Sequence, residues 1–100
     1  MAGKDAQTIV DEISVHIRKQ GGALSSWYTG ITENIESRLF GTHNVPRKDH
    51  WYIYREATSS EEARAAEQAL LDWGCDGGIG GGDDDAVFVY AYLKTSITEP

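Results

Sequence analysis

The stretch AVFVYAYL, residues 86–93, decides the fold of this chain. It is apolar almost throughout and rich in aromatic and β-branched side chains, which favour extended backbone. A strand with one face in solvent alternates apolar and polar residues, whereas a strand covered on both faces does not. We therefore predict a strand over residues 86–94 at the centre of a sheet, with another strand on each of its sides.

Two earlier stretches have the composition of those neighbouring strands. SSWYTGI at residues 25–31 and HWYIYREA at residues 50–57 combine aromatic with β-branched side chains. Gly30 lies near the end of the first stretch, where the missing side chain permits another group to approach the backbone closely. The tyrosines of the three strands are expected to come from neighbouring positions in one sheet.

Three segments have the periodicity of helices, namely residues 5–20, 33–40 and 59–73. In the first, isoleucine recurs at every fourth position and forms one apolar stripe. We expect Thr32 to be the N-cap of the second, with Ile35 and Leu39 facing inward. Ser59 and Glu62 have the spacing of a capping box at the start of the third.

The elements alternate in the order α-β-α-β-α-β, without an internal repeat or a linker. We predict a single domain over residues 1–100 of the α+β class, a small three-stranded sheet flanked by three helices. A chain of 100 residues buries one small core. The three tryptophans and five tyrosines are expected to belong mostly to that core.

Composition narrows the location of the protein. No apolar run approaches the roughly 18 residues that a membrane helix needs, so we expect no contact with a membrane. The N-terminus reaches acidic residues before any apolar stretch, which is not the pattern of a secretory signal. The single cysteine, Cys75, cannot form an internal disulfide and is expected to be a semi-buried bystander. A cytoplasmic protein is the expectation.

The net charge of −7 is unevenly distributed along the chain. Acidic and basic residues are equal in number over residues 1–50, so the whole excess of negative charge follows residue 50. Nucleic-acid-binding proteins usually present a basic face to the phosphates, so this balance disfavours a large duplex ligand. Residues 38–55 are locally basic and leave room for a small phosphate site.

Glu67 is out of place on the third predicted helix. At 100° per residue its direction falls inside the arc of apolar side chains that faces the core. An ionised carboxylate on a buried face is costly unless it is paired or binds a metal. Glu67 is therefore either a member of an internal ion pair, a residue at the solvated margin, or a carboxylate of a functional site.

A second cluster of interest follows the first predicted strand. Tyr28 and Gly30 lie on that strand, Arg38 on the next helix, and His43 just beyond it. Arg38 comes three residues after the inward Ile35, so it lies near the apolar side of its helix. The planar guanidinium group is suited to a phosphate, and a metal with a tyrosine or a water can complete phosphodiester chemistry.

The segment YTGITENIESRLFGTH, residues 28–43, resembles the second signature strand and following helix of the GIY-YIG nuclease superfamily. The family pattern is Tyr-x-Gly, a short turn, and an arginine eight residues after the glycine, which Gly30 and Arg38 match. WYIYREATSSEEARAAEQALL, residues 51–71, resembles the third strand and metal-binding helix, and Glu67 falls where the metal-ligating glutamate stands. The resemblance covers about residues 26–72 and implies a nuclease-like core over about residues 25–94.

The chain departs from that family at its beginning. The family opens with a central Gly-Ile-Tyr strand, whereas a helix and a Gly-Gly pair precede Trp27 here. We infer a circular permutation in which residues 86–94 occupy the place of the missing strand, with Tyr90, or alternatively Tyr92, as its tyrosine. The permutation requires that the strands of Tyr28 and His50 both flank residues 86–94. The family's late asparagine has no counterpart.

The resemblance implies a domain that acts on or binds a phosphodiester or a nucleotide. Its catalytic residues would be Tyr28, Arg38, Glu67 and Tyr90, with Mg²⁺ as the cofactor held by Glu67. Binding residues would be Gly30, His43, Arg47 and Lys48. The alternative is a non-catalytic module that sequesters a nucleotide-like ligand or docks its acidic second half on a protein partner.

The remaining features stay ambiguous at this level. The glycine-rich segment 77–82 is a flexible connection, a turn that needs positive φ, or part of a phosphate-binding pocket. It is not a P-loop, because no Gly-Lys-Ser/Thr follows. His16, one turn after Glu12 on the first helix, is expected to be a solvated side chain at the margin of the apolar stripe.

Overall fold

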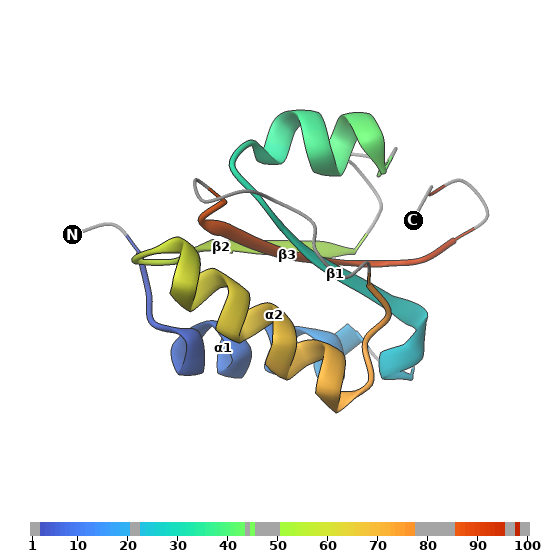
Figure 1. Ribbon diagram of the computed structural model, residues 1–100. Helices are drawn as coiled ribbons and strands as arrows, with labels where there is room; N and C mark the ends of the chain where they lie inside the picture. The colour runs from blue at the N-terminus through green and yellow to red at the C-terminus, as the bar shows by residue number, and fades with distance from the viewer. Residues whose placement is uncertain are drawn as a thin grey trace.

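The computed structural model describes residues 3–20, 23–43, 45, 51–77, 86–95 and 98. Its elements follow in the order α1 (Ala6–Gln20), η1 (Leu24–Ser26), β1 (Trp27–Thr32), η2 (Glu36–Thr42), β2 (Tyr52–Glu56), α2 (Ser60–Trp73) and β3 (Phe88–Leu93). The predicted α+β class is confirmed, because three helices pack around one three-stranded antiparallel sheet (Figure 1).

The sheet has the strand order β1-β3-β2. Both outer strands pair antiparallel with β3, with Gly30 opposite Tyr90 on one side and Tyr54 opposite Tyr90 on the other. The prediction that residues 86–94 form the central strand is therefore confirmed. Four consecutive residues of β3 are buried, as expected for a strand that is covered on both faces.

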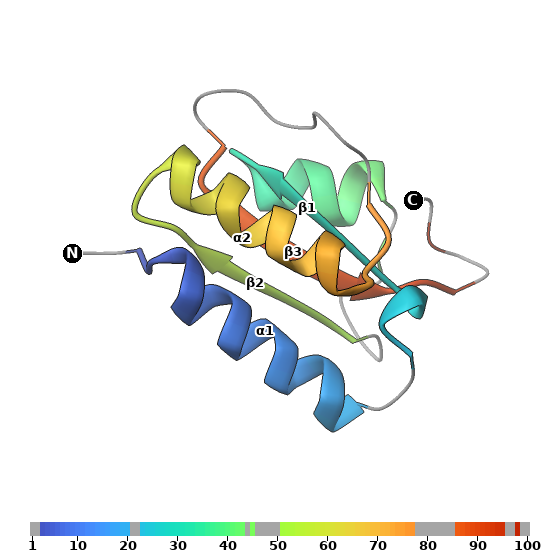
Figure 2. The ribbon, with the colours of Figure 1, turned by 60° about the horizontal axis from the view of Figure 1, so that its bottom comes forward.

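Helices cover both faces of the sheet. Figure 1 shows α1 and α2 below the sheet and η2 above it, and Figure 2 shows α1 running alongside β2. The core divides in the same way. The larger cluster, between the sheet and the helices α1 and α2, contains Ile13, Trp27 and Val89. The smaller cluster, between the sheet and η2, contains Leu39, Tyr90 and Tyr92.

The two α-helices begin and end at polar or glycine residues. The carboxylate of Asp5 accepts a hydrogen bond of 2.8 Å from the Thr8 amide at the start of α1. Ser59 accepts one of 3.2 Å from the Glu62 amide at the start of α2, as the capping box predicts. Gly74 ends α2 with a φ of 130°, a conformation that residues with a Cβ rarely adopt.

The second helix differs from the prediction. It is a π-helix that runs from Glu36 to Thr42, rather than a regular helix over 33–40. The side chain of Asn34, and not that of Thr32, accepts a hydrogen bond from the amide three residues later, that of Ser37. Ile35 and Leu39 face inward as predicted. A π-helix closes each turn one residue later than an α-helix, and such turns are frequent at functional sites.

Among the described helices, none is both long enough and apolar enough to cross a membrane.

Candidate functional site

All five tyrosines of the chain share one face of the sheet. Directly opposed residues on neighbouring strands point to the same side, and residues two apart along a strand do so as well. Tyr28 and Tyr52 both lie opposite Tyr92, while Tyr54 lies opposite Tyr90. We call this side of the sheet, which η2 covers, the tyrosine face. The expectation that tyrosines of the three strands are neighbours is confirmed.

His43 lies at the centre of the tyrosine face and is only 4% exposed. Its Nε2 is 2.7 Å from the hydroxyl oxygen of Tyr90, and its Nδ1 is 3.2 Å from that of Tyr92. A neutral imidazole has one N–H donor and one acceptor nitrogen. One tyrosine hydroxyl therefore donates to His43 while the other accepts from it, and the three side chains form a continuous hydrogen-bonded chain.

Tyr28 packs against this chain from β1. Its ring centroid is 5.4 Å from that of Tyr92 in a stacked arrangement and 5.0 Å from that of His43. Tyr28 is half-buried, whereas Tyr90 and Tyr92 are fully buried, so Tyr28 forms the accessible margin of the cluster. A ligand on this side would meet Tyr28 first.

Gly30 permits the close approach that its position predicts, but the approaching group is Tyr90. A Cβ built on Gly30 would lie 2.5 Å from the Tyr90 hydroxyl oxygen and 2.7 Å from the ring carbon that bears it. On the opposite face, Thr29 Oγ1 donates a hydrogen bond of 2.8 Å to the Tyr90 carbonyl. Gly30 thus serves to seat Tyr90 against β1, in reach of His43.

The two buried tyrosine hydroxyls stay protonated. Burial raises the pKa of Tyr90 well above its usual range, the charge on Tyr28 would raise it further, and Arg38 acts in the opposite direction. Burial also raises the pKa of Tyr92. The effect of Arg38 on Tyr90 shows that this guanidinium lies within electrostatic reach of the cluster.

The π-helix brings Arg38 and His43 to the same site. The His43 amide donates to the Arg38 carbonyl at 2.9 Å, which closes one five-residue turn at the end of the helix. Leu39 lies between them in sequence and is fully buried. Arg38 itself is half-buried, so it lies at the margin of the site while His43 lies inside it.

Glu67 faces inward, as its helical phase predicts, but from the other side of the sheet. It belongs to α2, whose neighbouring residues Ala66 and Leu70 pack into the larger core cluster. Glu67 is 7% exposed, and its Oε2 has no hydrogen-bond partner within the part of the chain that the structure describes. Burial raises its pKa, which the charge of Arg64 opposes.

The chemistry of Glu67 suits a cation only in part. A buried carboxylate oxygen without a donor is the kind of ligand that Mg²⁺ takes, usually with several waters and phosphate oxygens beside it. No group of three or more metal-ligating side chains occurs over residues 3–20, 23–43, 45, 51–77, 86–95 and 98. A charge on Glu67 would raise the pKa of Tyr90, but less than burial does.

The structure therefore brings together Tyr28, Gly30, His43 and Tyr90, places Arg38 at their margin, and holds Glu67 on the helix across the sheet. Arg47 and Lys48 lie outside the described residues, as does most of the glycine-rich segment. Tyr92 is a full member of the cluster, although the sequence suggested it only as a substitute for Tyr90. The sequence does contain a sign of this role, because every second residue from 88 to 92 is aromatic and these side chains share one face of the strand.

Comparisons with protein-family models, with curated proteins and with solved structures found no match for this chain.

Proposed function

We propose that the tyrosine face binds the phosphate of a phosphodiester or nucleotide, as the resemblance to GIY-YIG nucleases implies. The observation that carries the proposal is the cluster of His43 with Tyr90 and Tyr92, stacked against the accessible Tyr28. The central position of β3, which the permuted arrangement requires, supports the same reading. Arg38, at the margin of the cluster, supplies the positive charge.

Each residue has a distinct task in this proposal. Arg38 holds the phosphate through charge-assisted hydrogen bonds from its guanidinium group. Tyr28 presents its hydroxyl and ring to the ligand. Tyr90 and His43, 2.7 Å apart, exchange a proton, so that Tyr90 can take a proton from an attacking water as it passes its own to His43. Gly30 keeps Tyr90 in position for this exchange.

Cleavage by the nucleases that this chain resembles implies a divalent cation, and Glu67 is the residue that would hold Mg²⁺. When bound, such an ion stabilises negative charge that develops on a phosphate. The unpartnered Oε2 of Glu67 fits that role in its chemistry. Its helix packs against the face of the sheet opposite the His43 cluster.

A second candidate function is phosphate binding without cleavage. The specific observation in its favour is the burial of the two hydroxyls that His43 holds, since burial keeps both Tyr90 and Tyr92 protonated. In such a module the buried hydrogen bonds of His43 with Tyr90 and Tyr92 make the site rigid. Tyr28 and Arg38 bind a nucleotide-like ligand.

One experiment separates the two candidates. The purified domain is incubated with a fluorescent single-stranded oligonucleotide and Mg²⁺, and both cleavage and binding are recorded for the wild type, Arg38→Ala and Tyr28→Phe. Arg18→Ala, which alters an exposed arginine of α1 that lies over Trp73 and away from the tyrosine face, is the matched control for Arg38→Ala. All preparations follow the same purification, so a contaminating nuclease would be present equally in each.

Cleavage that falls roughly 100-fold in Arg38→Ala but not in Arg18→Ala supports the nuclease. Binding without cleavage, weakened about tenfold in Arg38→Ala, supports the binding module. If the wild type neither binds nor cleaves oligonucleotides or free nucleotides, or if the Arg38 and Arg18 variants behave alike, the site is wrongly assigned. Glu67→Gln, assayed with and without Mg²⁺, tests the metal separately.

A further inference from the structure

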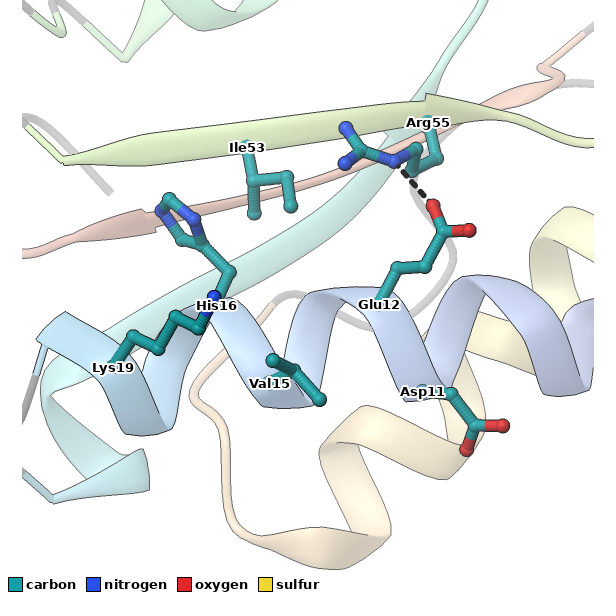
Figure 3. A pocket seen from close by; sticks show the side chains of 7 residues that line it. All are labelled: Asp11, Glu12, Val15, His16, Lys19, Ile53 and Arg55. Carbon is teal, nitrogen blue, oxygen red and sulfur yellow. Dashed lines mark hydrogen bonds and ion pairs between the residues drawn. The ribbon is translucent and has the colours of Figure 1, made fainter.

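A groove lies between α1 and β2, on the side of the sheet opposite the tyrosine face. It has a volume of about 370 Å³ and is lined by Asp11, Glu12, Val15, His16, Lys19, Ile53 and Arg55 (Figure 3). A second hollow of about 420 Å³ is lined by His16, Tyr52, Ile53, Tyr54 and Arg55. The two share His16, Ile53 and Arg55, so together they form one concave surface that follows β2, an outer strand of the sheet.

Arg55 is fixed in this groove. Its Nε donates to Glu12 Oε1 at 2.6 Å, and its Nη1 donates to the Tyr54 carbonyl at 2.8 Å. A guanidinium group carries five N–H donors, so these two contacts leave donors on the far end of the fork. Figure 3 shows that end directed along the groove, past Ile53 and toward His16.

His16 is less solvated than its position at the margin of the apolar stripe predicts. It is half-buried, its ring meets Trp27 edge to face at 5.8 Å, and its Nε2 is buried without a hydrogen-bond partner among the described residues. Burial lowers the pKa of His16, and the positive charges of Arg55 and Lys19 lower it further. His16 is therefore a neutral imidazole between two cations, with one ring nitrogen unused.

The acidic residues of the groove have partners of their own. Glu12 is already shared between Arg55 and Lys4, whose Nζ lies 3.3 Å from Glu12 Oε2. Asp11, which also lines the groove, accepts a hydrogen bond of 2.9 Å from Gln7. Lys19 takes part in no ion pair among the described residues. The lining therefore holds two acidic and two basic side chains, and the charges that act on His16 are those of Arg55 and Lys19.

We propose that this groove binds an oxyanion, the phosphate or carboxylate group of a ligand, between Arg55, Lys19 and the ring of His16. The anion would offset the two positive charges that His16 faces, and a protonated ring would add a third cation beside it. The site is separate from the His43 cluster, because it is built from α1 and β2 and shares no residue with that cluster.

The proposal makes binding depend on pH in a defined direction. Protonated His16 attracts the anion and the bound anion favours the protonated ring, so each raises the affinity for the other by the same factor. We expect a saturating oxyanion to raise the pKa of His16 by about one unit, which corresponds to roughly tenfold tighter binding at pH values where the ring is protonated. Binding should therefore strengthen as the pH falls through the pKa of His16.

Nuclear magnetic resonance of the histidine ring protons tests this directly, since the chain has only three histidines. The full-length protein is titrated between pH 5 and 8 in sodium sulfate, sodium acetate or sodium chloride at equal ionic strength. His16→Asn assigns the His16 signal. Sulfate stands for a phosphate group and acetate for a carboxylate, so the arm with the larger upward shift in the pKa of His16 identifies the source of the anion.

Lys19→Gln supplies the test of the geometry, with Arg18→Gln as its control. Both residues are exposed on the last turns of α1, but Arg18 lies over the ring of Trp73 on another side of the helix. The sulfate-induced shift should shrink by at least half in Lys19→Gln and persist in Arg18→Gln. An unchanged pKa of His16 in sulfate and acetate relative to chloride, or an equal loss in both variants, overturns the proposal. A shift confined to His43 would instead concern the tyrosine face.

Discussion

Replacement of Gly30 by alanine tests the central contact of the tyrosine face. The new Cβ would lie 2.5 Å from the Tyr90 hydroxyl oxygen, and ordinary contacts of this kind begin at 3.4 Å, so the ring must move by about 0.9 Å. The neighbouring hydrogen bond between Tyr90 and His43 is 2.7 Å long. A movement of that size along the bond takes it past 3.5 Å, beyond which it no longer counts as a hydrogen bond.

The expected loss of stability has two parts. Overpacking of a filled site costs about 1–3 kcal/mol. Loss of a buried hydrogen bond costs about 0.5–1.5 kcal/mol. We therefore expect Gly30→Ala to lower the free energy of unfolding by about 2–4 kcal/mol, which in a domain of this size lowers Tm by roughly 10–25 °C. Urea titration and thermal melts followed by circular dichroism measure both quantities.

Gly41→Ala is the matched control, because the nearest atom to its added Cβ is 3.9 Å away. Alanine at that helical position should leave stability unchanged or raise it by about 0.5–1 kcal/mol. Gly30→Ala combined with Tyr90→Phe should cost less than the sum of the single changes, because the second substitution removes the closest clashing atom. A Gly30→Ala protein within 0.5 kcal/mol of the wild type would refute the reasoning.

Three further outcomes are expected. Glu67 has a raised pKa in the folded protein, so its contribution to stability is present below its ordinary pKa of 4.5 and is lost as the pH rises through the folded value. Glu67→Gln should therefore be more stable than the wild type at pH 7 and equal to it near pH 4. Equal free energies of unfolding for the two proteins at both pH values would contradict the burial argument. Burial raises the pKa of Cys75 to about 11, so its thiol should react with a disulfide reagent at pH 8 far more slowly than the same thiol in urea, and equal rates in the two conditions would show that it is accessible. Ser59→Ala removes the cap of α2 and should cost about 1 kcal/mol in urea titrations, whereas Ser59→Asp, which can still accept from the Glu62 amide, should retain most of the stability.

The strand order could be predicted because one segment differs in kind from the others. Residues 86–93 are apolar on both alternating sets of positions, which only a central strand can bury. The ends of α2 were predictable for a similar reason, since Ser59 and Gly74 act within a few residues of themselves. Local signals of this kind need no knowledge of the tertiary structure.

The π-helix was not predictable in the same way. Its seven residues, Glu36–Thr42, contain too few apolar positions to distinguish a turn closed after four residues from one closed after five. Ile35 and Leu39 face inward in either geometry. The two geometries differ in where they place His43, which the wider turn brings against the tyrosine face. Its partners Tyr90 and Tyr92 come from a strand that follows 45 residues later in the chain, and no local pattern joins them.

Helical phase alone also left the place of Glu67 open. The phase identifies a side chain that points toward the core, but it does not say which face of the sheet the helix covers. The same limit applies to the tryptophans. Trp27 and four of the five tyrosines belong to the core clusters, as expected for most of these aromatic residues, whereas Trp51 and Trp73 are 47% and 43% exposed. Trp73 stands at the last position of its helix, where Arg18 covers part of its ring.

The central position of β3 also governs the order in which this domain can fold. Among the described strands β1 and β2 are not neighbours, and the strand with which each of them pairs is β3, the last of the three in the chain. Trp27 pairs with Leu93, so most of the polypeptide must be looped out before that register can close. During synthesis neither outer strand can therefore form its ladder with β3 until that last strand has emerged.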